Sequence, residues 1–398
     1  MTALDLIWRQ PTLLMIAGAL LAVGALHASV YPYQSLIAIN EIGLSEPAFG
    51  LVLVLASAVT VTASVLGGIL SDQRMIRRQV AVATTVAGTL AVALMAVVPG
   101  PVTLIVCHGI LFPIATSIYG QLFALTRLAS LGAESQRDAI QSTVRAGMSL
   151  SFLCMLVFWT WSFGNGADVM SVYISAGAAS LTLTLLIFWY WPRDGATHWV
   201  DKPSGLKLSQ AFGDIARPFV LVRLLCLGAI SSAGLLMMVL VSLVFDAAPG
   251  RDTGDVALYF GLIAGWEVPF LMLVPRLLRH VSRTHLLLAG TTLFCLHLAL
   301  MPVLADTVFV WGLTLIAGLG GSAIIAVPIV YFQDLMDGKP GTAGALMAVQ
   351  RLCGDVLSAA AFVGGTALGG YGLTALLGCV LPLAGAVGLV LADRRAAR

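Results

Sequence analysis

Long apolar runs recur along the whole 398-residue chain and constrain its fold more than any other feature. They come in blocks of about 20 residues, the length that an α-helix needs to cross the roughly 30 Å hydrocarbon core of a bilayer. Because backbone polar groups find no water there, a helix that pairs them internally is the expected structure. Only 10% of the residues are charged, against about 25% in soluble domains. The sequence therefore predicts an all-α protein that crosses a membrane many times.

The apolar runs predict twelve membrane helices in two sets of six. The first set is expected at residues 12–39, 48–71, 79–99, 102–126, 142–164 and 170–192. The second set is expected at residues 219–244, 257–278, 284–304, 308–331, 343–366 and 372–392. A long polar stretch separates the sets, which predicts an N-terminal bundle over 1–192, a cytoplasmic linker over 193–218 and a C-terminal bundle over 219–398.

The basic residues of the predicted loops and termini are distributed unequally across the membrane. With twelve spans, all of them except Arg251 fall on one side, whereas acids such as Glu46 and Asp168 mark the other. Cytoplasmic loops are enriched in Lys and Arg. We therefore expect both termini and the linker in the cytoplasm. The chain has no basic DNA-binding pattern, so no nucleic-acid partner is expected.

The two sets of helices share a local pattern. A Tyr-x-Gln triplet ends the fourth helix at Tyr119 and the tenth at Tyr331, and an arginine follows in the next helix at Arg145 and Arg351. Together with the layout of six helices, a linker and six helices, this match favours duplication. Two six-helix bundles related by an axis along the membrane normal form the architecture of the major facilitator transporters, which handle substrate at the interface of the halves.

The segment after the second predicted helix reads GILSDQRMIRR, from Gly68 to Arg78. It resembles the major facilitator signature G-x-L-x-D-R-x-G-R-K-R, although the base after the acid and the second glycine are missing. We interpret Gly68, Asp72, Arg77 and Arg78 as a conformational latch, in which Asp72 docks on the positive N-terminus of a helix in the other half. For the arginines, the alternative is the ordinary enrichment of positive charge in cytoplasmic loops.

Three further stretches narrow the resemblance. They are IYGQLFALTR at 118–127 with RDAIQSTVRAGMSLSF at 137–152, GLIAGWEVPFLMLVPRLLR at 261–279, and VYFQDLMDGKPGTAGAL at 330–346. In order, spacing and wording they resemble the bacterial sugar efflux transporters, a branch of the major facilitator superfamily. This resemblance implies an exporter of lactose, glucose or related glycosides that is driven by protons.

Glu267 interrupts an apolar run near the middle of the eighth predicted helix, in the sequence GWEVP. A charge at that depth costs about 2.5–3.5 kcal/mol on insertion scales, so the side chain should face the protein interior or water. We interpret Glu267 as a proton-coupling acid and as a ligand for sugar hydroxyls, beside Trp266, whose ring can stack on a sugar. The alternative is a structural acid paired with a base on another helix.

Three more ionisable residues are candidates for the site. Arg351 and Asp355 have i, i+4 spacing on the eleventh helix and can pair with each other. Asp355 is the second proton-coupling candidate, with Arg351 binding substrate and tuning it, and mutual neutralisation is the alternative. Arg145 has no acid one turn away, so we assign it to substrate binding, with extension to the cytoplasmic edge as the alternative.

The other predicted substrate-binding residues are uncharged or weakly basic. His27, Tyr31 and Gln34 recur at helical spacing on the first helix and form a stripe suited to hydroxyl groups. Gln121 and Gln350, from the fourth and eleventh helices, complete the set.

The remaining histidines and the cysteines are expected to have structural roles. His108 and His297 are expected to make interior hydrogen bonds, and the six cysteines, without CxxC spacing, to act as small hydrophobic residues. Because there is neither an HExxH motif nor a phosphate-binding glycine loop, we expect no metal, no cofactor and no enzymatic activity.

The leading prediction is therefore a proton-coupled exporter of sugars or glycosides, working by alternating access as a monomer in the lipid bilayer. The nearest alternative is a drug or small-metabolite antiporter of the same fold. A non-transporting membrane sensor is the alternative from another class, but a sensor should carry a soluble signalling domain, and none is expected in this chain.

Overall fold

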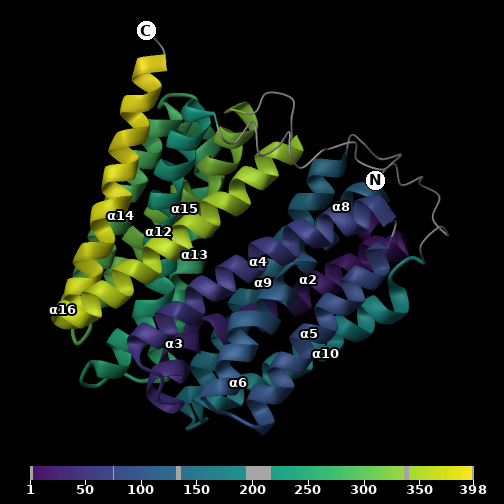
Figure 1. Ribbon diagram of the computed structural model, residues 1–398, viewed down its shortest axis with the longest axis horizontal. Coiled ribbons are helices and arrows are strands. Elements are labelled where there is room, and N and C mark those ends of the chain that lie inside the picture. The colour runs from purple at the N-terminus through teal and green to yellow at the C-terminus, as the bar shows by residue number, and fades with distance from the viewer. Residues whose placement is uncertain (1–2, 75, 131–135, 194–216, 336–339, 397–398) are drawn as a thin grey trace. The chain divides into compact units, whose positions relative to one another are not determined.

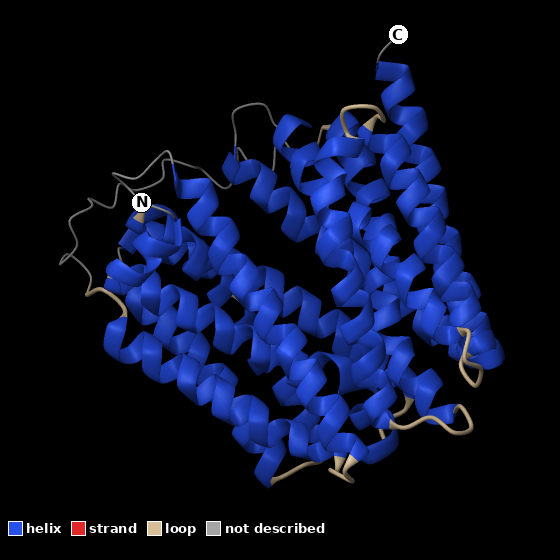
Figure 2. Cartoon of the chain, turned by 180° about the vertical axis from the view of Figure 1, so that it is seen from behind, coloured by secondary structure: helices blue, strands red, loops and turns tan. Residues whose placement is uncertain are grey.

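The computed structural model describes residues 3–74, 76–130, 136–193, 217–335 and 340–396. These residues are helical almost throughout, and Figure 2 shows no strand among them. In the first half (Figure 1), the helices are α1 (Ala3–Arg9), α2 (Pro11–Val30), η1 (Tyr31–Tyr33), α3 (Gln34–Leu36), η2 (Ile37–Glu41), α4 (Glu46–Arg74), α5 (Arg77–Val97), α6 (Pro101–Val106), η3 (Cys107–Leu111), α7 (Phe112–Thr116), α8 (Ile118–Ala129), α9 (Arg137–Gly164), η5 (Val169–Ser171) and α10 (Val172–Tyr190). In the second half they are α12 (Pro218–Ala247), α13 (Thr253–Leu277), α14 (Arg283–Leu304), α15 (Val310–Leu335) and α16 (Pro340–Ala396).

Eleven stretches of helix in the described part of the chain are long and apolar enough to cross a membrane. The last of them, Leu346–Arg394, has 49 residues, and its backbone leaves the helical conformation at Gly369 and Gly370. Gly370 has a φ of 75°, in the left-handed region that glycine enters without steric cost. The break divides this stretch into two membrane helices. The predicted fold class, with twelve membrane helices, is therefore confirmed.

Proline and capping residues mark where several helices begin. Pro11, Pro101 and Pro218 lie in the first turns of α2, α6 and α12, where the N–H that proline lacks would have no helical partner. Asp252 caps α13, because its side chain accepts the backbone N–H of Asp255 at 3.0 Å. These local signals convert apolar runs into helices with defined starts.

Contacts between residues divide the chain into two compact units. The first unit consists of Met1–Tyr33 and Ala58–Gly205, and the second of Gln34–Ser57 and Leu206–Arg398. The domains predicted from the sequence differ, because they leave residues 34–57 in the first bundle. Those domain boundaries stay a prediction, and each compact unit is described by itself.

In the first unit, α2 packs against α9 and α10, and α10 packs against α5. A Cβ atom added at Gly24 of α2 would lie 2.3 Å from the carbonyl oxygen of Met148 on α9. Glycine therefore allows the two backbones to approach closely. The core between these helices is apolar and includes Leu13, Ile16 and Leu122.

In the second unit, α12 packs along α16, α14 lies against both α15 and α16, and α13 lies against α15 (Figure 1). Residues such as Leu224, Val327, Phe332 and Leu389 form its core. This unit carries both acids that the sequence predicts for proton coupling.

Candidate functional site

Glu267 lies on α13, and its carboxyl group faces α15. A Cβ atom added at Gly321 of α15 would lie 2.8 Å from Glu267 Oε1 and 3.4 Å from the ring of Phe294 on α14. The carboxyl group therefore occupies space that the missing side chain of Gly321 leaves open. Glu267 is half-buried, and within the described part of the chain nothing gives its carboxylate a hydrogen bond or a positive charge.

Trp266, the neighbour of Glu267, remains accessible. It is 42% exposed, although its Cβ packs so closely on α15 that a Cβ atom at Gly318 would lie 2.5 Å away. Two glycines thus let α13 approach α15 at the point where the predicted acid and aromatic residue stand together. The backbone is held in place while much of the indole surface stays free for contact.

Asp355 lies on α16 and has two partners. Ser57 on α4 donates its hydroxyl to Asp355 Oδ2 at 2.5 Å, and Arg351 Nε lies 3.9 Å from the same oxygen. The Asp355 side chain is 14% exposed and that of Arg351 62%. The i, i+4 pair that the spacing indicated is therefore present, with the acid inside and the base largely outside.

His27 and Tyr31 line a small cavity inside the first unit. Their rings meet edge to face with centroids 4.9 Å apart, and Thr116 and Ser180 also border the cavity. About 20 Å³ is open to the centre of a water molecule, which is room for about one water and too little for a sugar. Gln34, the third member of the predicted stripe, belongs to the second unit and is half-buried.

The other predicted binding residues differ in their surroundings. Gln121 on α8 is buried, and its Oε1 has no hydrogen-bond partner in the described part of the chain. Arg145 on α9 is exposed. Gln350 is buried and donates through Nε2 to the carbonyl of Leu227 on α12 at 3.4 Å. Of these residues, Gln121 has an unsatisfied acceptor and Gln350 makes an interhelical contact.

The predicted latch lies at the junction of α4 and α5. Arg78 Nη2 donates to the carbonyl of Phe188 on α10 at 2.7 Å, and its guanidinium lies 5.5 Å from the centre of the Phe188 ring. This contact joins the start of α5 to the end of α10 within the first unit. Gly68 and Arg77 also interact with other residues, and the side chain of Asp72 lies outside the described residues.

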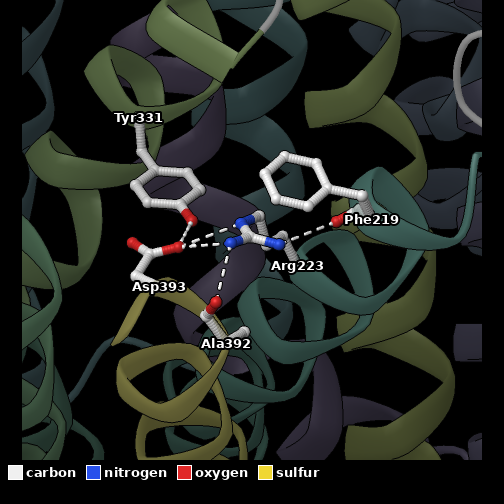
Figure 3. A network of polar contacts seen from close by, with 5 residues as sticks. All are labelled: Phe219, Arg223, Tyr331, Ala392 and Asp393. Atoms are coloured by element: carbon white, nitrogen blue, oxygen red, sulfur yellow. Dashed lines mark hydrogen bonds and ion pairs between the residues drawn. The ribbon is translucent and has the colours of Figure 1, made fainter. Parts of the chain in front are cut away.

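A buried arginine that the sequence patterns did not single out, Arg223, joins three helix ends of the second unit (Figure 3). Its Nε and Nη2 lie 3.0 and 2.8 Å from Asp393 Oδ1, an oxygen that also accepts the hydroxyl of Tyr331 at 2.8 Å. The guanidinium donates to the carbonyls of Phe219 and Ala392 and lies 3.6 Å from the centre of the Phe219 ring. The missed signal was an arginine in the second turn of an apolar helix, which is costly unless paired.

Both remaining intramembrane histidines are paired with tyrosines. His108 Nε2 lies 2.7 Å from Tyr173 Oη in the first unit, and His297 Nε2 lies 2.8 Å from Tyr259 Oη in the second. The interior hydrogen bonds expected for these histidines are therefore present. All six cysteines are free.

Comparisons with known proteins agree with this architecture. A family model described as the Major Facilitator Superfamily matches residues 16–362. A Deinococcus radiodurans protein named "Putative sugar efflux transporter" is 26% identical over 402 residues, spanning 97% of this chain and 99% of its own length.

Solved transporter structures are similar over nearly the whole chain. The nucleoside transporter NupG matches with a TM-score of 0.80 at 15% identity, covering 96% of this chain and 99% of its own. A peptide transporter POT in complex with sulfate matches with a TM-score of 0.77 at 12% identity, covering 96% and 94%. Identities this low show a shared fold and leave the substrate open.

Proposed function

Because the chain belongs to the major facilitator superfamily and is a multi-pass membrane transporter of that type, we propose that it exports sugars or glycosides and is driven by protons. The likeness to the Deinococcus protein supports the substrate class. The proposal includes a monomer in the bacterial inner membrane, with both termini in the cytoplasm and no enzymatic activity. It also includes the latch of Gly68, Asp72, Arg77 and Arg78.

The observation that supports proton coupling best is the lone carboxyl group of Glu267. No cation or hydrogen-bond donor of the described residues holds it in one protonation state, so it can exchange a proton whenever water reaches it. An ionised carboxylate only accepts hydrogen bonds, whereas a protonated carboxyl also donates one. Proton uptake therefore changes which sugar hydroxyls the group can bind, and this difference links the two events.

Several side chains support sugar binding. The exposed ring of Trp266 offers a surface for the apolar face of a sugar, and the unpaired oxygen of Gln121 offers an acceptor for a hydroxyl. We assign the exposed guanidinium groups of Arg145 and Arg351 to hydroxyl recognition as well. His27, Tyr31, Gln34 and Gln350 complete the proposed set of substrate-binding residues.

One proton per cycle is sufficient for this task. A charge that crosses about 100 mV releases about 2.3 kcal/mol, and one pH unit adds about 1.4 kcal/mol. Since each tenfold concentration ratio costs about 1.4 kcal/mol, the sum sustains a gradient of a neutral sugar of several hundred-fold. A single titrating carboxyl group therefore meets the energetic requirement.

The test is transport of labelled glycosides by the purified protein in liposomes, with and without a pH gradient. Glu267→Gln should abolish accumulation driven by the gradient and retain counterflow without one, because the amide is similar in size but cannot titrate. Gly321→Ala should weaken driven accumulation too, since its Cβ would lie 2.8 Å from Glu267 Oε1. Asp306→Asn, at an exposed acid between α14 and α15, is the matched control and should match the wild type.

Two results would overturn the proposal. Driven accumulation that persists in Glu267→Gln would show that another group carries the proton. Transport of lipophilic cations with no glycoside carried across a broad panel would assign the chain to the antiporters of drugs or other metabolites.

A further inference from the structure

Residues 34–57, from the end of the first membrane helix into α4, are fastened to α12 within the second unit. Ser35 Oγ lies 2.8 Å from Ser242 Oγ, a contact between two neutral hydroxyls. Asn40 Nδ2 donates to Asp246 Oδ2 at 2.6 Å, near the end predicted to be extracellular. The segment is therefore anchored by specific hydrogen bonds.

The same segment is fastened to α16 by a row of contacts along α4. The rings of Phe49 and Phe362 meet edge to face with centroids 6.1 Å apart. A Cβ atom added at Gly50 would lie 3.9 Å from the Cβ of Val363. As residue numbers rise along α4 they fall along α16, so the two helices run antiparallel here.

The contact of this row that lies farthest from the end predicted to be extracellular is the hydrogen bond from Ser57 to Asp355. Ser57 is 4% exposed, and it is the last residue of α4 in the second unit, because Ala58 and the residues after it group with the first. The contacts of Phe49 and Gly50 lie toward the end predicted to be extracellular. The link therefore lies at the end of the part of α4 that groups with α16.

Asp355 is the titratable group of this link, and few groups act on it. Arg351, on the same helix, is the charged group that acts on the carboxylate, at 3.9 Å. α4 supplies the Ser57 hydroxyl, and α12 supplies Ser231, whose hydroxyl would lie 2.5 Å from a Cβ atom added at the neighbouring Gly354. The strength of the link thus depends chiefly on whether Asp355 is ionised.

Protonation weakens such a link for a simple electrostatic reason. A hydrogen bond to an ionised acceptor is roughly twice as strong as one between neutral groups. When Asp355 takes up a proton, Ser57 faces a neutral carboxyl group and Arg351 loses its counter-charge. The contribution of the link to the row is therefore present while Asp355 is ionised and is reduced as the pH falls through its titration.

We propose that the Ser57–Asp355 hydrogen bond is a proton-sensitive fastening, which holds α4 on α16 while Asp355 is ionised and releases this row when Asp355 is protonated. The inference rests on the proposed proton-coupled transport and deepens it. Asp355 acts in the conformational step, and Ser57 is the residue that positions it. Separation of the row frees residues 34–57 from α16.

The experiment measures opening of the row directly. Ala359 is buried on α16, and its carbonyl would lie 3.9 Å from a Cβ atom at Gly50. Ala359→Cys is introduced into the full-length protein with the six native cysteines replaced, and the protein is placed in liposomes. The rate of modification by a small water-soluble maleimide then reports how often α4 leaves α16.

Asp355→Asn imitates the protonated acid. Labelling of Ala359→Cys is therefore compared at each pH between protein with Asp355 and protein with Asp355→Asn. The ratio of the two rates cancels the pH dependence of the thiol itself. At high pH, Asp355→Asn should be labelled about five- to tenfold faster than the wild-type background. At low pH, where Asp355 is protonated, the two rates should converge. Ser57→Ala should speed labelling and remove the pH-dependent difference, and Ser57→Thr, which keeps the hydroxyl, should restore it.

Ser35→Ala is the matched control, because it removes a neutral contact of the same segment. It should raise the labelling rate but preserve the dependence on Asp355 and pH. A labelling ratio that does not change with pH overturns the proposal, as does loss of the pH dependence in Ser35→Ala. If Ser57→Ala fails to fold, the comparison of Asp355→Asn with Ser35→Ala still decides.

A second measurement confirms that the row forms in the membrane. The Gly50→Cys and Val363→Cys pair has a Cβ separation of 3.9 Å, within the 3.5–4.5 Å range of disulfides, and should cross-link readily. Labelling requires no transport, so the experiments can refute either proposal without refuting the other. A pH-dependent ratio without driven glycoside transport refutes the proposed function alone, whereas driven transport with a flat ratio refutes the fastening alone.

Discussion

At the scale of single residues, the ionisable groups inside the helices differ in how well they are partnered. Arg223 is matched by Asp393 and two backbone carbonyls. Asp355 is paired with a serine hydroxyl and with an exposed arginine. The carboxyl group of Glu267 has no polar partner in the described part of the chain. Each such group carries an insertion cost. Full pairing offsets this cost structurally, so the least-paired groups are the ones that a transport cycle can use.

The Arg223–Asp393 pair gives an asymmetric stability prediction. The Arg223 side chain is 4% exposed and that of Asp393 34%. Asp393→Ala leaves a buried cation without its counter-charge and should cost about 3–5 kcal/mol. Arg223→Met leaves an anion that water reaches, and it should cost about 1–2 kcal/mol. Tyr331→Phe, which removes one donor, should cost about 1 kcal/mol.

These three variants are compared by denaturation of the purified protein in one detergent. The order of the losses is the decisive result. Equal losses of stability for Asp393→Ala and Arg223→Met would contradict the prediction, because the unpaired buried cation would then cost no more than the unpaired anion that water reaches.

At the scale of the elements, the sequence predicts what depends on local pattern and misses what depends on neighbours. The eleventh helix is predicted to end at residue 366 and the twelfth to begin at residue 372, and the observed break at Gly369–Gly370 lies between them. The length of an apolar run and the position of a glycine are local features, so the sequence predicts this break. The Arg351–Asp355 contact also follows from spacing. By contrast, Ser57 and Asp355 are 298 residues apart, and no period in the sequence joins them. Which helices pack together decides that pair.

The break in α16 predicts opposite effects for two nearby glycines. Gly370 has a φ of 75° and Gly372 does not adopt a positive φ, while a Cβ atom would meet nothing within 4 Å at either position. Gly370→Ala should therefore destabilise the protein by about 1–2 kcal/mol, the cost of a left-handed conformation. Gly372→Ala should be neutral or stabilising by up to about 1 kcal/mol, since alanine favours a helix. Thermal unfolding of both variants tests this, and a loss at Gly372 as large as that at Gly370 would contradict it.

At the scale of the whole molecule, the architecture persists where the sequence does not. NupG shares the fold with a TM-score of 0.80 at only 15% identity, because apolar helices of membrane length satisfy the bilayer with many different sequences. What the chain carries must therefore be decided by the few polar residues placed on those helices. This is why the fold followed from the sequence with little ambiguity, whereas the roles of Glu267 and Asp355 require experiments.

The number of membrane crossings follows from the lengths of the apolar helices. The last apolar stretch has 49 residues, which as one straight helix would be about 74 Å long, more than twice the roughly 30 Å hydrocarbon core. It must therefore cross the membrane twice and turn at Gly369–Gly370. Alkaline phosphatase fused after Gly370 should be active, because that point is predicted to be extracellular, and a fluorescent protein fused after Arg398 should fluoresce in the cytoplasm. A fusion within residues 193–218 should behave like the one after Arg398. The same reporter active at both Gly370 and Arg398 would mean one crossing fewer and would place the two ends of the chain on opposite sides.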